Sequence, residues 1–188
     1  MIAMNSAVFA ESGRVSPEGP KLYPEFEHLG PASDFIEEIF QIIEHIPLFE
    51  DMSRQEVGYL CRYMLCYGAP RNATLLREGD EGQHLLIVLT GNIDVIKDTP
   101  KGSRSIAVAG VGSSLGEMSM IDGARRFASC IATEPTDFAV LTRTALTEIV
   151  IDHPGLGSKL LLLLLQVMTR RLRDASNLLL PYIAGDAV

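Results

Sequence analysis

The spacing of apolar residues divides the chain into four segments. Residues 1–33 carry four prolines with glycines and serines and show no sustained apolar period, which predicts a flexible N-terminal extension. Apolar residues recur at helical spacing over 34–65, which predicts N-terminal helices. The period changes to two over 66–142, and helical spacing returns over 143–188. The pattern therefore predicts a mainly β fold with flanking helices.

Two helices are predicted before the β-rich segment. The first is amphipathic, begins at Ser33 or Asp34 and ends at Pro47, since proline cannot continue a helix. Ser53 is followed three residues later by Glu56 in the capping-box arrangement, so a second helix should begin there.

The β-rich segment consists of short apolar runs separated by turn residues, a spacing typical of a sandwich or barrel. The predicted strands are 73–77, 85–89, 93–97, 105–109, 128–133 and 137–142. Strands that close on themselves leave no exposed edge, so we expect a compact roll.

A long helix is predicted to run from about Ser158 to Leu180, after a break at 154–157. Its first half is apolar on more than one side, so it must cover the roll and a second surface. The most economical second surface is its own copy in a symmetric dimer, which makes 143–188 a predicted dimerisation and hinge region. Packing within one chain is the alternative.

Composition excludes several functional classes. The length of 188 residues fits one domain, and the net charge of −8 predicts a surface that repels phosphate backbones, so we expect no direct DNA binding. The longest apolar run, 160–165 with the three residues after it, is too short to span a membrane.

Residues with the chemistry of nucleophiles or metal ligands form no recognisable motif. Cys61, Cys66 and Cys130 match neither a zinc site nor a disulfide framework, and no secretory leader is evident, which favours a reducing, cytoplasmic setting. No Ser–His–Asp, Cys–His or paired-carboxylate arrangement stands at a motif spacing. We therefore predict no metal, no cofactor and no enzymatic activity.

The segment GEMSMIDGARRFASCIA, residues 116–132, carries the most informative chemistry. It offers a glycine turn with exposed backbone N–H groups, the carboxylate of Glu117 and, nine residues later, Arg126. Backbone N–H groups bind anions, and one guanidinium can clamp a phosphate with two hydrogen bonds. A carboxylate beside them suits sugar hydroxyls. The segment thus fits a ligand with one negative charge and a free hydroxyl.

At these residues the chain resembles the cyclic nucleotide-binding domains of catabolite-activator-type regulators, cAMP-dependent kinase regulatory subunits and cyclic nucleotide-gated channels. The resemblance runs from about Pro47 to the C-terminus and rests on Pro47–Leu48–Phe49, Glu78–Gly79–Asp80, Gly91, and Gly116–Glu117 with Arg126. It implies an eight-stranded double-stranded β-helix, a jelly-roll-like β-roll with flanking helices.

The resemblance also implies a ligand, cAMP or cGMP, and the residues that bind it. Glu117 would meet the ribose 2′-hydroxyl and Arg126 the cyclic phosphate, and spacing from Glu117 favours Arg126 over Arg125. The implied ligand-binding residues are Gly116, Glu117, Met118, Arg126, Phe127 and Ala128. Phe127 departs from the family pattern, which has a small residue there; its ring could occlude the pocket, turn away, or stack on a purine.

Three functional hypotheses follow. The first is a stand-alone cyclic nucleotide sensor, a single-domain form without a helix-turn-helix, that signals through its last helix to an unidentified effector protein or to its dimer mate. The second is a ligand-free scaffold whose pocket Phe127 fills. The third is a modulator that forms mixed dimers with transcription regulators through the last helix.

Overall fold

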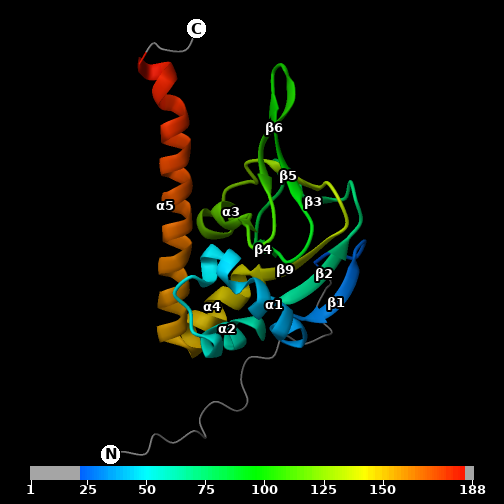
Figure 1. Cartoon of the computed structure of the whole chain (residues 1–188), viewed down its shortest axis with the longest axis vertical. Helices are drawn as coiled ribbons and strands as arrows, with labels where there is room; N and C mark the ends of the chain where they lie inside the picture. The colour runs from blue at the N-terminus through cyan, green and yellow to red at the C-terminus, as the bar shows by residue number, and fades with distance from the viewer. Residues whose placement is uncertain (1–21, 185–188) are drawn as a thin grey trace, which may run out of the picture.

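The computed structural model describes residues 22–184, with side chains to residue 180, as a β-roll flanked by helices (Figure 1). In chain order the elements are β1 (Glu27–Pro31), the 3-10 helix η1 (Ala32–Phe35), α1 (Ile36–Ile42), the 3-10 helices η2 (Ile43–His45) and η3 (Pro47–Phe49), α2 (Arg54–Cys61), β2 (Leu65–Ala69), β3 (Thr74–Leu76), β4 (His84–Val88), β5 (Ile93–Thr99), β6 (Gly102–Ala109), β7 (Ser114–Leu115), α3 (Glu117–Asp122), β8 (Ser129–Ala132), β9 (Thr136–Thr142), α4 (Arg143–Asp152) and α5 (Pro154–Ala184). The mainly β fold predicted from the sequence is confirmed.

Two antiparallel sheets form the roll, one in the order β1-β2-β9-β4-β7 and the other in the order β3-β8-β5-β6. Residues on alternate faces of β4 enter different cores, because successive side chains of a strand point to opposite sides. Leu86 and Val88 face the interior between the sheets, whereas Leu85 and Ile87 pack under the helices. A strand buried on both faces explains the continuous apolar run in this part of the sequence.

The capping box predicted for α2 is present. The Ser53 hydroxyl accepts a hydrogen bond from the Glu56 backbone N–H, and the Glu56 carboxylate accepts one from the Ser53 N–H at 2.7 Å. The helix before it is shorter than the periodicity predicts, because α1 ends at Ile42 and a 3-10 turn follows up to His45.

The last helix starts earlier than predicted, at Pro154 rather than near Ser158. Proline fits the first turn of a helix, where its missing N–H would have no partner. Gly157 sits against α4, and a Cβ there would lie 2.6 Å from the Cα of Val150, so glycine allows the two helices to pack closely. The predicted break is therefore the tight junction between α4 and α5.

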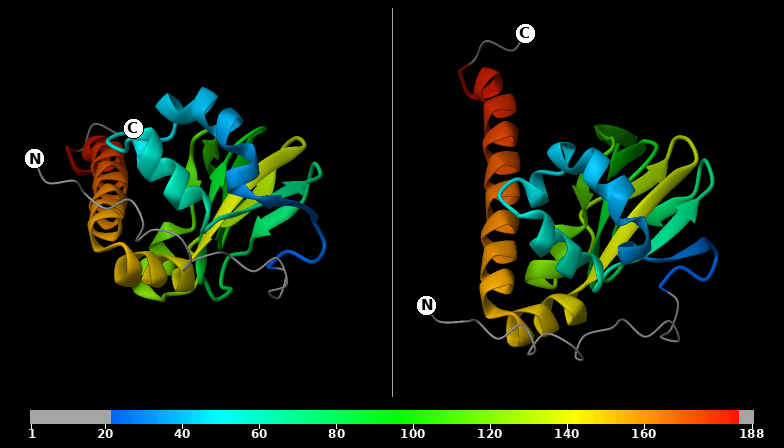
Figure 2. Two further views of the ribbon diagram at one scale, coloured as in Figure 1. Left: turned by 90° about the horizontal axis from the view of Figure 1, so that it is seen from below. Right: turned by 60° about the horizontal axis from the view of Figure 1, so that its bottom comes forward.

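The two halves of α5 differ in burial. Leu160, Leu163, Leu164 and Val167 are buried against the other helices and the roll. Every described side chain from 170 to 180 is exposed, and Figures 1 and 2 show the helix continuing past the roll along one side of the molecule. Within 22–184, no helix is long and apolar enough to cross a membrane.

The segment that precedes the first helix differs from its prediction. Residues 27–31 form β1, which pairs with β2 from Glu27 opposite Gly68 to Pro31 opposite Leu65, instead of remaining a flexible extension. Over residues 22–184 the two sheets contain five and four strands, which is one strand more than the eight implied by the family resemblance. Local composition is rich in proline, but pairing with an exposed sheet edge orders this strand. The rest of the predicted extension, residues 1–21, lies outside the described part of the chain.

Candidate functional site

The candidate site forms where β7 runs into α3. Gly116 precedes the helix with a φ of 84°, in the left-handed region that favours glycine. A Cβ at this position would lie 2.5 Å from Nη1 of Arg126, so the guanidinium occupies the space that a side chain would need. Gly82 is constrained similarly, because its Cβ would lie 2.9 Å from Cζ of Arg126. Two glycines thus make room for one arginine.

Arg126 is held on several sides. Its Nη1 donates to the Gly116 carbonyl and its Nη2 to the His84 carbonyl, both at 2.8 Å. Its backbone N–H donates to the Asp80 carbonyl at 2.8 Å, and its carbonyl accepts from the Gly79 N–H at 2.9 Å. These contacts fix the guanidinium inside the roll.

Arg126 is buried with its charge unpaired by any carboxylate of the described residues. The residue is 4% exposed, and within residues 22–180 no carboxylate lies at ion-pair distance from it. Burial lowers the pKa of the guanidinium, although arginine remains charged at physiological pH. A buried cation bonded only to neutral carbonyls favours the approach of an anion.

Glu117 is buried next to Gly116 and is bound from a distant part of the chain. One of its oxygens, Oε1, pairs with Nη1 of Arg171 on α5, and Nη2 of Arg171 donates to the Ser114 carbonyl at 2.5 Å. The second oxygen, Oε2, is buried and has no hydrogen-bond partner among the described residues. The carboxylate therefore keeps one oxygen available to accept a hydrogen bond.

The remaining predicted residues differ in exposure. Ala128 is buried, while Met118 is 47% exposed and Phe127 is 56% exposed. Arg125 lies at the surface, where its Nη1 donates to the Gly79 carbonyl at 2.7 Å. Of the two neighbouring arginines, only Arg126 points into the roll and contacts Gly116. The structure thus brings Gly116, Glu117 and Arg126 together, with Phe127 at the surface beside them.

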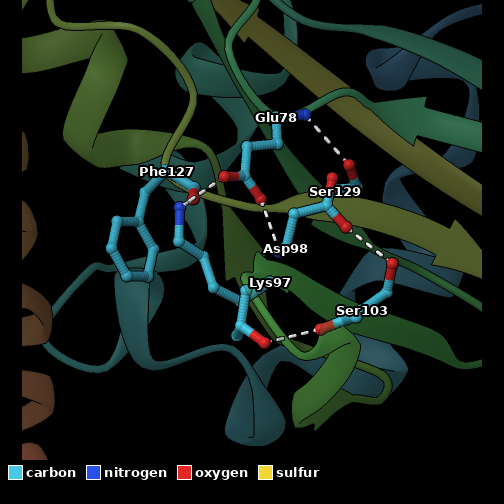
Figure 3. Close-up of polar contacts among 8 residues, drawn as sticks. Glu78, Lys97, Asp98, Ser103, Phe127 and Ser129 are labelled. Atoms are coloured by element: carbon cyan, nitrogen blue, oxygen red, sulfur yellow. Dashed lines mark hydrogen bonds and ion pairs between the residues drawn. The ribbon is translucent and has the colours of Figure 1, made fainter.

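The ring of Phe127 lies against a charged group instead of filling the roll (Figure 3). Nζ of Lys97 lies 4.5 Å from the ring centroid and donates to the Phe127 carbonyl at 2.7 Å. The same ammonium pairs with Glu78 at 2.5 Å, and the Asp98 N–H donates to the other oxygen of Glu78 at 2.9 Å. These two interactions, the Asp98 N–H first, lower the pKa of Glu78. Glu78 thereby links the turn of residues 78–80 to β5, the strand that carries Lys97.

Sequence reasoning missed two residues that bear on the site. Arg171 belongs to no motif singled out in the sequence, yet it pairs with Glu117, which lies 54 positions earlier in the chain. Tyr23 falls in the segment predicted to be flexible, yet it is 5% exposed and its hydroxyl lies 2.7 Å from Nε2 of His84. No local periodicity signals contacts over such sequence separations. Among the described residues, no group of three potential metal ligands comes together.

The chain is similar in sequence and in fold to known proteins. Residues 69–153 match the family model described as the cyclic nucleotide-binding domain. The crystal structure of a cyclic nucleotide-binding domain from Methylobacillus flagellatus is 52% identical in sequence, with a TM-score of 0.77, and the match covers 87% of this chain and 92% of that one. The catabolite activator protein of Thermus thermophilus is 29% identical with a TM-score of 0.66, over 73% of this chain and 63% of that one.

Curated relatives extend the similarity to transcription regulators. The cyclic AMP receptor protein of Thermus thermophilus is 32% identical over 130 residues, which are 69% of this chain and 58% of that protein. The CRP-like cAMP-activated global transcriptional regulator of Mycobacterium tuberculosis is 25% identical over 147 residues, 78% of this chain and 64% of that protein. The chain thus spans about six tenths of the length of these relatives.

Proposed function

Because this chain belongs to the cyclic nucleotide-binding domain family, we propose that it binds cAMP or cGMP at Gly116, Glu117 and Arg126 and acts as a non-enzymatic regulatory module. The observation that carries the proposal is the buried guanidinium of Arg126, which is fixed by two carbonyls and has no carboxylate partner in the described chain. A cyclic phosphate supplies one negative charge, which matches this single cation.

Glu117 is the proposed contact for the ribose of the ligand. Its buried Oε2 lacks a hydrogen-bond donor, and the 2′-hydroxyl of a ribose can supply one. Oε1 remains with Arg171 in this arrangement, so the ligand adds a contact without displacing the ion pair. A carboxylate satisfied on both oxygens is more stable than one with an orphaned oxygen, and this difference favours ribonucleotides over their 2′-deoxy forms.

The same carboxylate provides the route for a signal. Arg171 is carried by α5 and bonds to both Glu117 and the Ser114 carbonyl, so a ligand that contacts Glu117 changes the environment of the helix. We therefore place the output of the module at α5, whose described residues from 170 onward are exposed. Ligand binding would shift the balance between positions of this helix in proportion to its preference for one of them.

A second copy of the chain is the partner best suited to α5. Exposed or half-exposed apolar residues recur along one stripe at alternating spacings of four and three: Leu161, Leu165, Met168, Leu172, Ala175 and Leu179. This is the repeat of a two-stranded coiled coil. A symmetric dimer along α5 would bury this stripe and would join the two sites through one helix pair. Mixed dimers with related regulators would use the same stripe.

The scaffold hypothesis required Phe127 to fill the pocket. Phe127 is 56% exposed and its ring lies against Lys97, so the ring does not fill the interior of the roll. This geometry favours the sensor over the scaffold. An exposed ring on the residue that follows Arg126 also remains available to contact a purine.

Isothermal titration of the purified chain with cAMP and with cGMP tests the proposal, with 5′-AMP as a control that carries more charge but lacks the ring. Saturable binding of a cyclic nucleotide, and much weaker binding of 5′-AMP, is the expected result. A folded protein that binds neither cyclic nucleotide would contradict the proposal and favour the scaffold hypothesis.

A further inference from the structure

Tyr23 belongs to a segment that precedes the region matched by the family model, yet it is buried inside the roll. Its ring stacks on Phe26 with centroids 5.2 Å apart, and it meets Tyr67 and Phe138 edge-on, each at 5.3 Å. Pairing of β1 with β2 anchors the chain directly after it. The rings packed around Tyr23 therefore hold its side chain in a single position.

The hydroxyl of Tyr23 joins the two sheets of the roll. It donates to the Leu75 carbonyl of β3 at 3.0 Å, and it lies 2.7 Å from Nε2 of His84 on β4. A phenol has one hydrogen, and a carbonyl can only accept, so Nε2 of His84 must carry the hydrogen of the second bond. Burial, and then the charge of Arg126, lower the pKa of His84 to about 4, so the ring is neutral at physiological pH.

His84 connects this bridge to Arg126. Its ring bonds to Tyr23, while its backbone carbonyl accepts a hydrogen bond from Nη2 of Arg126 at 2.8 Å. A change at the hydroxyl of Tyr23 thus reaches the guanidinium through a single residue.

The surroundings make these hydrogen bonds important for the position of Arg126. Tyr23, His84 and Arg126 all line one cavity of about 250 Å³. Since the guanidinium borders this cavity, protein side chains do not pack closely against it on this side. The strand β1 and the helix α5 lie on opposite sides of the roll (Figures 1 and 2).

We propose that Tyr23 is a positioning residue for Arg126, and that residues 22–31 form a structural part of the phosphate site. The hydroxyl holds His84 and β3 in place, and the His84 carbonyl in turn orients the guanidinium. The link to nucleotide binding rests on the proposed function. The link to the position of Arg126 does not, because it concerns the unliganded protein.

The test compares two full-length variants, Tyr23→Phe and Tyr67→Phe. Each removes one buried hydroxyl from the same aromatic cluster and keeps the ring, but no hydrogen bond joins the Tyr67 hydroxyl to His84 or Arg126. A purely structural role for Tyr23 predicts similar effects of the two changes. The first measurement is the ¹⁵N–¹H NMR signal of the Arg126 side-chain Nε–H in the unliganded protein, assigned with Arg126→Lys.

Tyr23→Phe should shift this signal and speed its exchange with water by about fivefold, the equivalent of one hydrogen bond, while Tyr67→Phe leaves it unchanged. The second measurement is titration with cAMP and cGMP. Both ligands carry the same cyclic phosphate. Tyr23→Phe should therefore lower the affinity for each of them by about fivefold and leave the ratio of the two affinities unchanged.

An Arg126 signal that is unaffected by Tyr23→Phe, or affected equally by Tyr67→Phe, would overturn the inference. If the wild-type protein binds neither nucleotide, the proposed function fails, and the NMR comparison still decides whether Tyr23 positions Arg126. If the signal changes while the affinities for both nucleotides do not, Tyr23 has no role in ligand binding and the inference fails at that step.

Discussion

The two ends of the candidate site are held in different ways. Arg126 is fixed by neighbours within the roll, namely the carbonyls of Gly116 and His84, and two glycines leave no room for it to be displaced toward them. Glu117 is held by Arg171, whose side chain is 44% exposed on the helix that runs past the roll. One end is held entirely within the roll, and the other is shared with the last helix, through which we propose the signal passes.

Because of this difference, we expect the Arg126 end to determine the affinity for the nucleotide and the Glu117 end to determine the response of α5. A preorganised cation binds an anion without the cost of ordering side chains at that moment. A carboxylate shared with α5 couples occupancy of the pocket to the helix, because any change at Glu117 is felt by its partner Arg171. We therefore expect substitutions at the Arg126 end to change how tightly a nucleotide binds, and those at the Glu117 end to change which nucleotide binds and what α5 does.

The largest effect is expected from Arg126→Ala. Loss of two charge-assisted hydrogen bonds to the phosphate should lower the affinity for cAMP or cGMP by about 100-fold or more, as measured by titration. The matched control is Arg125→Ala, since Arg125 is exposed and its Nη1 donates to the Gly79 carbonyl at the surface. An equal loss in both variants, with both proteins folded, would mean that the buried arginine is not the phosphate ligand.

His84 should make the Arg126 end sensitive to acid. Its folded pKa of about 4 lies below the value of about 6.5 for an unfolded histidine, so its contribution to stability is complete above pH 6.5 and is lost as the pH falls toward 4. Between pH 7.5 and pH 5 this amounts to about 2 kcal/mol. Urea unfolding at the two pH values should show a smaller loss for His84→Gln. Parallel pH curves for the variant and the wild type would show that His84 is not buried in its neutral form.

Glu117→Gln should mainly change the selectivity for cAMP over 2′-deoxy-cAMP. The wild-type protein should prefer cAMP over 2′-deoxy-cAMP by about 10-fold, the value of one hydrogen bond to a charged group. In Glu117→Gln the preference should fall to about twofold, because the bond to a neutral amide is weaker. A variant that keeps the full preference would place the ribose elsewhere.

The smallest effect on nucleotide affinity is expected in the distal part of α5. Leu172→Glu puts a charge into the proposed dimer stripe and should give a monomer in analytical ultracentrifugation, with affinity per site changed by about twofold or less. Asn177→Glu, on the same exposed stretch but outside the stripe, should leave the dimer intact. A wild-type protein that is already monomeric at high concentration would refute the dimer.

Local sequence signals predicted much of the fold. The capping box of Ser53 and Glu56 is present, and the apolar runs from residue 73 onward are strands in the structure, since both depend on neighbours a few residues apart. The cluster of Gly116, Glu117 and Arg126 was also predicted, because a short motif carries all three residues.

Contacts between distant parts of the chain could not be predicted in this way. The pairing of Arg171 with Glu117, the packing of Tyr23 inside the roll and the ordering of β1 depend on where the folded chain places its surfaces. Phe127 shows the same limit at a single residue. Three orientations of its ring were open from the sequence, and the ammonium of Lys97 on a neighbouring strand accounts for the one observed.

The central claim is that one nucleotide spans both ends of the site, and a crystal structure of the chain with saturating cAMP tests it most directly. The account predicts phosphate oxygens within hydrogen-bond distance of the Arg126 guanidinium and the 2′-hydroxyl at Oε2 of Glu117, with Arg171 still bound to Oε1. A nucleotide bound elsewhere, including in the cavity beside Tyr23, or a phosphate that does not meet Arg126, would contradict it.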